Sequence, residues 1–514
     1  MEIYRLILMR NSRTRNSTYS MLACVIYYSA NILFGLANRK FLISILGIEY
    51  QGVNGLFGSV LNMLSIAELG IGTAIIYHLY RPLANDNKEM VGSIMQFYKN
   101  CYRGIALVML TVGMILSVKL DFFVTASSLP VNIHIVYYLM LADVIATYTF
   151  AYKRSILYAD QKNYIVAIIN TFFVVCCNIV QVGILYWTKD YYLYLSVKLG
   201  LRLLENISIN IYVSKHYAYL SAKKYPKIAK DLLKDIIQKI KGLLFHKIGT
   251  FVVNGTSNIL ISKFLGLALV GIYSNYYYVI SAINSVLQQA FDGTTGSVGN
   301  LLATEDSSKR LSIFEELNGI NTLFSAIAVN MLFVLINPFI KTIFGDEFVL
   351  NHTIVILLVL NMIFTNQRRV FGVFKAASGI QYEDRYVPIA ESLTNIIISV
   401  ILLFKFGLAG IFVGMLVAQC CVYLYTFPIL IYRNVMKKSI TDYTKYLLFV
   451  FSFHIISLSS VSWVFHVFIE ETIMNYAIKG CVACIQTILI FYVFWHNTDS
   501  YQHMLNRIKL IIKK

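Results

Sequence analysis

Residues 163–187 read NYIVAIINTFFVVCCNIVQVGILYW, and this stretch holds no charged side chain. At about 1.5 Å of rise per residue, a helix of this length crosses the roughly 30 Å hydrocarbon core of a bilayer. Its apolar residues run continuously, without the period-two alternation of a membrane β-strand. Because lipid offers the backbone no hydrogen-bond partners, the stretch predicts a transmembrane α-helix.

Similar apolar stretches recur along all 514 residues. Hydrophobic residues make up 58% of the chain and charged residues only 14%, against about 25% charged in a soluble domain. We therefore predict an all-α integral membrane protein with about fourteen transmembrane helices. The predicted spans are 20–46, 53–80, 92–118, 131–152, 163–187, 191–213, 243–264, 268–296, 312–342, 350–376, 386–405, 407–432, 445–469 and 473–495.

The basic residues predict the orientation of these spans. The formal net charge is +18, but most Lys and Arg residues lie in alternate connections, which the positive-inside rule assigns to the cytoplasm. Both termini are then cytoplasmic, and nucleic acid is not an expected partner. Residues 214–242 form the longest connection. Their lysines alternate with apolar residues at helical spacing, which predicts an amphipathic helix on the inner membrane surface.

The chain also resembles itself. Leu46-Gly47 followed by Gly52 recurs as Leu265-Gly266 followed by Gly271, with a shift of 219 residues. Six predicted spans separate the two copies, so both start in the same orientation. Parallel repeats of this kind occur in transporters whose substrate site lies between the two halves. The last two spans fall outside the repeat.

Ionisable residues inside the predicted spans point to a polar interior. Each costs about 2.5–3.5 kcal/mol at the centre of a membrane helix, so they are expected to avoid lipid. Lys198, Arg202 and Glu205 are spaced by four and three residues and should share one helical face. The candidate substrate-binding cations of a net-positive cavity are Arg39, Lys40, Lys198, Arg202, Arg368 and Arg369; the candidate acids for ion coupling or pairing are Glu68, Asp143, Glu205 and Asp292.

Two interpretations of these charges remain open. The cations could hold an anionic group such as a diphosphate, because Arg makes bidentate phosphate contacts and Lys supplies a point charge. Alternatively, they could form ion pairs within the membrane, for example Arg202 with Glu205 or Lys40 with Glu68. Nucleotide-binding, metalloprotease and nucleophile–base motifs are not found, so we expect no catalytic residue, metal or cofactor, and no enzyme activity.

Several motifs resemble those of the polysaccharide transporters, the O-antigen and capsular repeat-unit flippases of the multidrug/oligosaccharidyl-lipid/polysaccharide (MOP) exporter superfamily. The similarity extends over nearly the whole chain. It is carried by the order and spacing of the segments at 46–52, 67–74, 80–84, 159–162, 271–276, 297–301, 337–340, 377–379, 384–395 and 407–414.

The resemblance implies a MATE-like fold with two pseudo-symmetric six-helix bundles and two extra C-terminal helices. The chain then divides into an N-terminal bundle (1–213), a cytoplasmic amphipathic linker (214–242), a C-terminal bundle (243–432), and a region with the two extra helices and a cytoplasmic tail (433–514).

The resemblance also implies a function. A flippase of this kind moves an undecaprenyl-diphosphate-linked oligosaccharide to the outer leaflet of the bacterial cytoplasmic membrane by alternating access. The expected partners are this lipid-linked substrate, membrane lipids and polysaccharide assembly proteins, with H+ or Na+ open as the coupling ion. The alternatives are a cation-coupled multidrug exporter of the same superfamily and, less favoured, a membrane glycosyltransferase or O-antigen polymerase.

Overall fold

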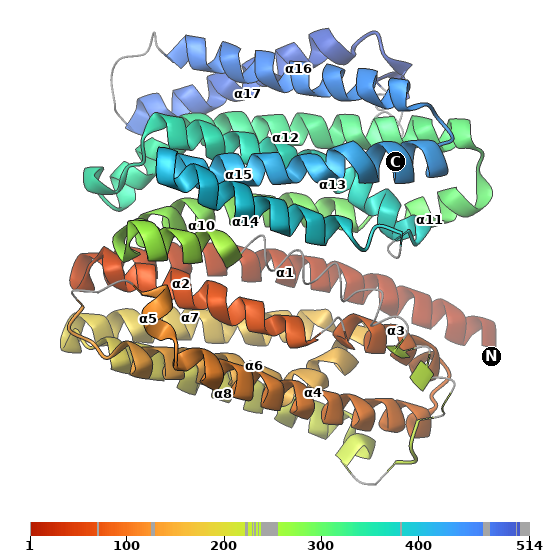
Figure 1. Cartoon of the computed structure of the whole chain (residues 1–514). Coiled ribbons are helices and arrows are strands. Elements are labelled where there is room, and N and C mark those ends of the chain that lie inside the picture. The colour runs from red at the N-terminus through yellow and green to blue at the C-terminus, as the bar shows by residue number, and fades with distance from the viewer. Residues whose placement is uncertain are drawn as a thin grey trace. The chain divides into compact units, whose positions relative to one another are not determined.

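The computed structural model describes residues 2–503 except 69–70, 125–128, 222–224, 229, 231–232, 235, 238–254, 381–382, 466–472 and 500. The described residues form helices and connecting turns without any strand, which confirms the predicted all-helical class (Figure 1). Contact clustering divides the chain into two compact units, Met1–Gly271 and Ile272–Lys514.

The N-terminal unit contains long helices joined by short connections. Their bounds are α1 (Glu2–Leu46), α2 (Ile48–Leu64), η1 (Ser65–Glu68), α3 (Ile71–Ala84), α4 (Lys88–Ser117), α5 (Leu120–Phe123), α6 (Ile133–Ala159), α7 (Asn163–Thr188), α8 (Tyr191–His216), η2 (Ala218–Ser221) and a helix over 255–265. In this unit α1 packs along α7, and α6 packs against both α4 and α8 (Figure 1).

The C-terminal unit continues from α10, whose first turn belongs to the N-terminal unit. Its elements are α10 (Leu267–Asp292), α11 (Thr295–Thr304), α12 (Ser307–Ile343), η3 (Asp346–Phe348), α13 (His352–Ser378), α14 (Val387–Phe406), α15 (Leu408–Cys421), η4 (Val422–Val435), α16 (Ile440–Phe465) and α17 (Ile473–Trp495). Here α14 packs on α15, and α12 packs on α13, α16 and α17.

Eight described helices are long and apolar enough to cross a membrane, and a ninth candidate is the pair Ile133–Thr149 and Ala151–Ala159, which bends by 42°. These results support a multi-pass membrane protein. The predicted span 191–213 coincides with α8 but carries Lys198, Arg202 and Glu205, so its composition is more polar. The predicted span 53–80 is not one helix, because a 3₁₀ turn at Ser65–Glu68 separates α2 from α3. The prediction for 243–254 lies outside the described residues.

Polar side chains at the helix N-termini explain where several helices begin. Asp190 accepts hydrogen bonds from the backbone N–H groups of Tyr192 (2.7 Å) and Leu193 (3.2 Å), at the start of α8. Asn132 caps α6 and Asn351 caps α13 in the same way. A side-chain cap of this type satisfies donors that the helix cannot, and contributes about 1 kcal/mol.

The first part of the predicted linker packs on the N-terminal unit. The backbone N–H of Tyr225 donates to Gln96 Oε1 (2.9 Å), and a Cβ placed on Gly92 would lie 2.3 Å from the Tyr225 ring. Ile228 packs against the core of the same unit. Burial raises the pKa of Tyr219 to about 12, so its hydroxyl stays protonated at neutral pH. Apolar and aromatic contacts therefore hold the described part of residues 217–228, which we call the strap, on the unit. The amphipathic helix of the linker stays a prediction, because much of 229–242 lies outside the described residues.

The last two helices are attached to the C-terminal unit through buried polar contacts. The amide of Asn330 on α12 donates to Ser457 Oγ on α16 (2.6 Å) and to Thr487 Oγ1 on α17 (2.8 Å). All three side chains are buried. Helix–helix hydrogen bonds of this kind join helices in an environment where apolar burial gives little driving force.

Candidate functional site

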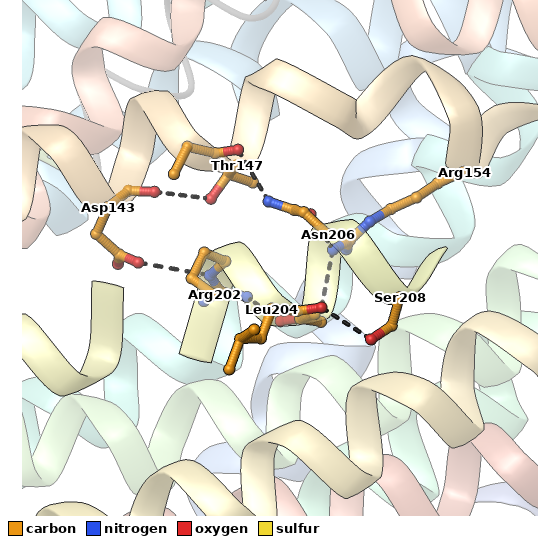
Figure 2. A network of polar contacts seen from close by, with 9 residues as sticks. Asp143, Thr147, Arg154, Arg202, Leu204, Asn206 and Ser208 are labelled. Carbon is orange, nitrogen blue, oxygen red and sulfur yellow. Dashed lines mark hydrogen bonds and ion pairs between the residues drawn. The ribbon is translucent and has the colours of Figure 1, made fainter. Parts of the chain in front are cut away.

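A cluster of five charged side chains lies between α6 and α8. Lys198 Nζ is 3.2 Å from Asp143 Oδ2, and Arg202 Nε is 3.5 Å from Asp143 Oδ1. Arg202 Nη1 also lies 2.9 Å from Glu205 Oε2. Figure 2 shows Arg202 directed toward Asp143, with Asn206 and Arg154 nearby. The predicted common face of Lys198, Arg202 and Glu205 is confirmed by these contacts, and so is the Arg202–Glu205 pair.

Arg154 completes the cluster, although the sequence analysis did not select it. Its Nη2 lies 2.8 Å from Glu205 Oε1 and 2.8 Å from Asn206 Oδ1. The signal was present in the spacing, since Asp143 and Arg154 are eleven residues apart, about three helical turns. Its position just beyond the predicted end of the span made it appear to be a membrane-flanking residue.

The cluster carries a surplus positive charge. Three cations face two carboxylates, which leaves a net charge of +1. The acids are the more enclosed members, with side-chain exposures of 11% for Asp143 and 5% for Glu205, against 38% for Lys198 and 32% for Arg202. Lys198 and Arg202 are thus the members of the cluster that are more accessible from outside the unit, and the acids lie beneath them.

In the C-terminal unit, two adjacent arginines on α13 have different surroundings. Arg368 makes a bidentate ion pair with Glu391 on α14, at 2.5 Å and 3.0 Å. Arg369 is 5% exposed, and its Nη2 contacts only the backbone and side-chain oxygens of Asn284, at 3.3 and 3.2 Å. Among the described residues, Nε and Nη1 of Arg369 have no hydrogen-bond partner. Such a buried, incompletely bonded cation is costly unless a ligand or another group neutralises it.

The remaining candidates are more dispersed. On α1, Arg39 is half-buried and Lys40 is exposed. Glu68 accepts a hydrogen bond from the Tyr102 hydroxyl (2.8 Å). Asp292 is exposed and accepts from Gln288 (2.7 Å). The predicted alternative of a Lys40–Glu68 ion pair is not seen among the described residues, where Glu68 accepts from the Tyr102 hydroxyl.

Glu68 ends a chain of hydroxyl groups in the interior of the N-terminal unit. The Ser155 hydroxyl donates to Tyr98 (3.2 Å), Tyr98 donates to Tyr102 (3.0 Å), and Tyr102 donates to Glu68. Sequence reasoning identified the carboxylate but not the tyrosines, because tyrosines are frequent in this chain and no spacing singles these out.

The long apolar helices define a multi-pass membrane protein, and its fold is similar to those of solved transporters, including members of the MOP superfamily. The structure is similar to "Lipid II flippase MurJ, inward closed conformation", with a TM-score of 0.64, 15% identity, and coverage of 93% of this chain and 99% of that one.

Two further structures show the same fold. An inward-facing multidrug resistance MATE transporter of the MOP superfamily has a TM-score of 0.63 at 13% identity, and covers 82% of this chain and 99% of its own. A MOP superfamily transporter from Pyrococcus furiosus has a TM-score of 0.53 at 14% identity, and covers 83% of this chain and 97% of its own. No protein-family profile and no curated protein matches the sequence.

Proposed function

We propose that this chain is a flippase for undecaprenyl-diphosphate-linked oligosaccharide repeat units. It moves them from the inner to the outer leaflet of the bacterial cytoplasmic membrane, by alternating access, for O-antigen, capsule or related surface polysaccharide. In this proposal both termini face the cytoplasm, as the distribution of Lys and Arg predicts.

The observation that carries the proposal is the state of Arg369. Its guanidinium is buried in a membrane-spanning helix, and two of its nitrogens have no partner among the described residues. Guanidinium groups match phosphate oxygens in a planar, bidentate geometry. A diphosphate supplies the negative charge and the acceptor oxygens that this side chain needs. An organic cation would instead add to the positive charge.

The cluster on α6 and α8 supports the same substrate class. Its net charge of +1 favours an anion, and its most exposed members are the cations Lys198 and Arg202. A phosphate could replace Asp143 as the partner of Lys198, while Arg154 keeps Glu205 paired.

The fold comparison supports a lipid-linked substrate because the similarity to the lipid II flippase covers nearly all of both chains. The multidrug exporter remains a second candidate, since the similarity to the MATE transporter has a comparable TM-score. Charge is the feature that separates the two. An exporter of organic cations is expected to have an acidic interior, whereas cations outnumber acids in the described cluster.

A transport assay with both substrates tests the proposal. The purified protein is reconstituted in vesicles containing a fluorescent undecaprenyl-diphosphate-linked saccharide, and transfer between leaflets is followed by chemical quenching. A parallel set of vesicles receives a fluorescent cationic drug. Transfer of the lipid, together with restored surface polysaccharide in a flippase-deficient strain, is expected. Drug transport without lipid transfer would replace the flippase by the exporter.

A further inference from the structure

The surface of α10 changes from polar to apolar around the helix axis. Val286 is 58% exposed, and together with Val279 and Ala290 it forms an apolar flank. The other flank carries polar side chains that follow each other at three or four residues, so they lie along one line of the helix. We call this line the polar flank, and its members are Tyr277, Ser281, Asn284, Ser285, Gln288 and Asp292.

The polar flank is unsuited to contact with lipid. Gln288 and Asp292 are exposed, and an amide or a carboxylate in hydrocarbon lacks the hydrogen-bond partners that water supplies. Ser281 and Ser285 are less diagnostic, because their hydroxyls donate to carbonyl groups of their own helix (3.0 and 2.7 Å). The contrast is α14 of the same unit, whose exposed residues at this spacing are Leu393, Ile397, Ile401 and Phe404. We therefore infer that the polar flank lines a water-accessible surface.

The polar flank contacts the buried guanidinium group of Arg369 on α13. Arg369 Nη2 lies 3.3 Å and 3.2 Å from the backbone and side-chain oxygens of Asn284, in the middle of the flank. Asp292 acts on Arg369 as a nearby charge and accepts a hydrogen bond from Gln288 (2.7 Å). Gly372 follows Arg369 by almost one turn, and a Cβ there would meet no atom within 4 Å, so space is left on this side of α13. All five residues belong to the C-terminal unit.

We propose that the polar flank binds the saccharide of the lipid-linked substrate, while Arg369 holds the diphosphate. This inference rests on the proposed flippase function. Sugar hydroxyls donate and accept hydrogen bonds, as amide side chains do, and a carboxylate accepts from them. Tyr277 is 42% exposed and offers its ring to the C–H groups of a sugar. From Tyr277 to Asp292 the flank extends over about 22 Å, at 1.5 Å per residue, which gives room for more than one sugar unit.

Other occupants of the polar flank would require different chemistry. A further phosphate group would be repelled by Asp292, and the flank itself contains no cation. An apolar drug binds best among apolar and aromatic side chains, whereas the flank has a single aromatic ring. Neutral hydrogen-bonding groups with one acid therefore favour a ligand rich in hydroxyl groups. Water alone would also satisfy these groups, and the two experiments below distinguish water from a saccharide.

Photo-cross-linking in cells tests the contact between the full-length protein and its own substrate. A benzophenone amino acid replaces Tyr277 or Gln288, and Ile397 on the exposed apolar face of α14 is the matched control. The mass of each adduct identifies what was captured. At Tyr277 and Gln288 we expect adducts that contain sugar and diphosphate, and at Ile397 we expect phospholipid. Adducts without sugar at both flank positions, in cells that export the glycan, would overturn the proposal.

A comparison of two lipids gives an independent test on the purified protein. The measured quantity is the ratio of its affinities for undecaprenyl-diphosphate-linked saccharide and for undecaprenyl diphosphate. Gln288→Leu is expected to lower this ratio by about fivefold, which corresponds to the loss of one hydrogen bond. Gln288→Asn keeps an amide and should recover part of the ratio.

Two further variants serve as controls for the affinity ratio. Val286→Ala, on the apolar flank of the same helix, should change neither affinity. Arg369→Met should weaken the binding of both lipids and leave their ratio unchanged. A ratio that keeps its wild-type value in both Gln288→Leu and Tyr277→Leu would contradict the role of the polar flank.

The saccharide contact and the proposed function fail in distinguishable ways. If the wild-type protein transfers the lipid-linked saccharide while the flank variants keep the wild-type affinity ratio, the flippase stands and the polar flank is not its saccharide site. If the wild-type protein transports the cationic drug and not the lipid, both proposals fail together.

Discussion

Arg368 and Arg369 are neighbours on α13, yet only Arg368 has a carboxylate partner among the contacts that the structure describes. Arg368 is held by both oxygens of Glu391, whereas the hydrogen bonds described for Arg369 go to Asn284, and Asp292 acts on it only as a nearby charge. Adjacent helical residues point about 100° apart, so the two guanidinium groups serve different purposes. We assign the first to the structure of the C-terminal unit and propose the second for the substrate.

Replacing Arg369 by Met should separate function from stability. Arg369 has no carboxylate ion pair among the described residues, and Asp292 acts on it only as a nearby charge, so its removal is expected to leave the free energy of unfolding unchanged or raise it by about 1–4 kcal/mol. Transfer of the lipid-linked saccharide should nevertheless be lost. The measurements are thermal unfolding in detergent and the vesicle assay. Arg433→Met, at an exposed position, is the control and should change neither. A destabilised but active Arg369→Met would remove Arg369 from the site.

The Arg368–Glu391 pair should behave in the opposite way. Arg368→Met alone leaves the buried Glu391 without its partner, and should lower the free energy of unfolding by about 3 kcal/mol. The double substitution Arg368→Met with Glu391→Leu removes both charges and should recover most of this loss. A double-mutant cycle on unfolding measures the coupling, and additive effects of the two substitutions would show that the pair contributes nothing.

Arg202 links the two acids of the α6–α8 cluster. Its removal tests whether export requires the net positive charge of this cluster. Arg202→Ala should block glycan export while the protein still inserts in the membrane. Arg202→Gln combined with Asp143→Asn restores the balance of charge, and should recover stability but not export. Surface polysaccharide and the amount of protein in the membrane are measured together. Normal polysaccharide in Arg202→Ala would exclude Arg202 from the substrate site.

Among the candidate acids, we select Glu68 to test the predicted ion coupling. Asp143 is less suitable, because loss of its charge would leave Lys198 and Arg202 without their shared carboxylate partner. Glu68 is instead bonded by a neutral group, the Tyr102 hydroxyl. Glu68→Gln should therefore make transport insensitive to a pH gradient across the vesicle, and Tyr102→Phe should weaken the response partially. A Glu68→Gln variant that still responds to the gradient in full would direct attention to another ion or another acid.

The contacts of the strap should limit the access of proteases to the predicted linker, residues 214–242. Tyr225→Ala removes the ring that covers Gly92, so trypsin is expected to cleave the linker several-fold faster than in the wild type. Tyr80→Ala, at an exposed position on α3, serves as the control. Equal cleavage rates in the two variants would mean that the Tyr225 ring does not hold the linker.

Much of the fold could be predicted from the sequence because every span in lipid must satisfy its backbone hydrogen bonds internally, which requires a continuous apolar helix. The common face of Lys198, Arg202 and Glu205 followed from helical periodicity alone. The partners of these residues did not, since Asp143 and Arg154 reach α8 only through packing of two helices far apart in sequence. Glu391 lies within the segment 384–395 that carries the family resemblance, but no spacing identifies it as the partner of Arg368, for the same reason. The break between α2 and α3 also escaped prediction, because its apolar composition matches that of a continuous span.

The attachment of α16 and α17 through Asn330 has a consequence for biosynthesis. A chain that has left the ribosome only as far as α15 would expose the Asn330 amide to hydrocarbon, with neither Ser457 nor Thr487 available. We therefore expect the packing of α12 to be completed only when α16 and α17 insert and supply the two acceptors of the Asn330 amide.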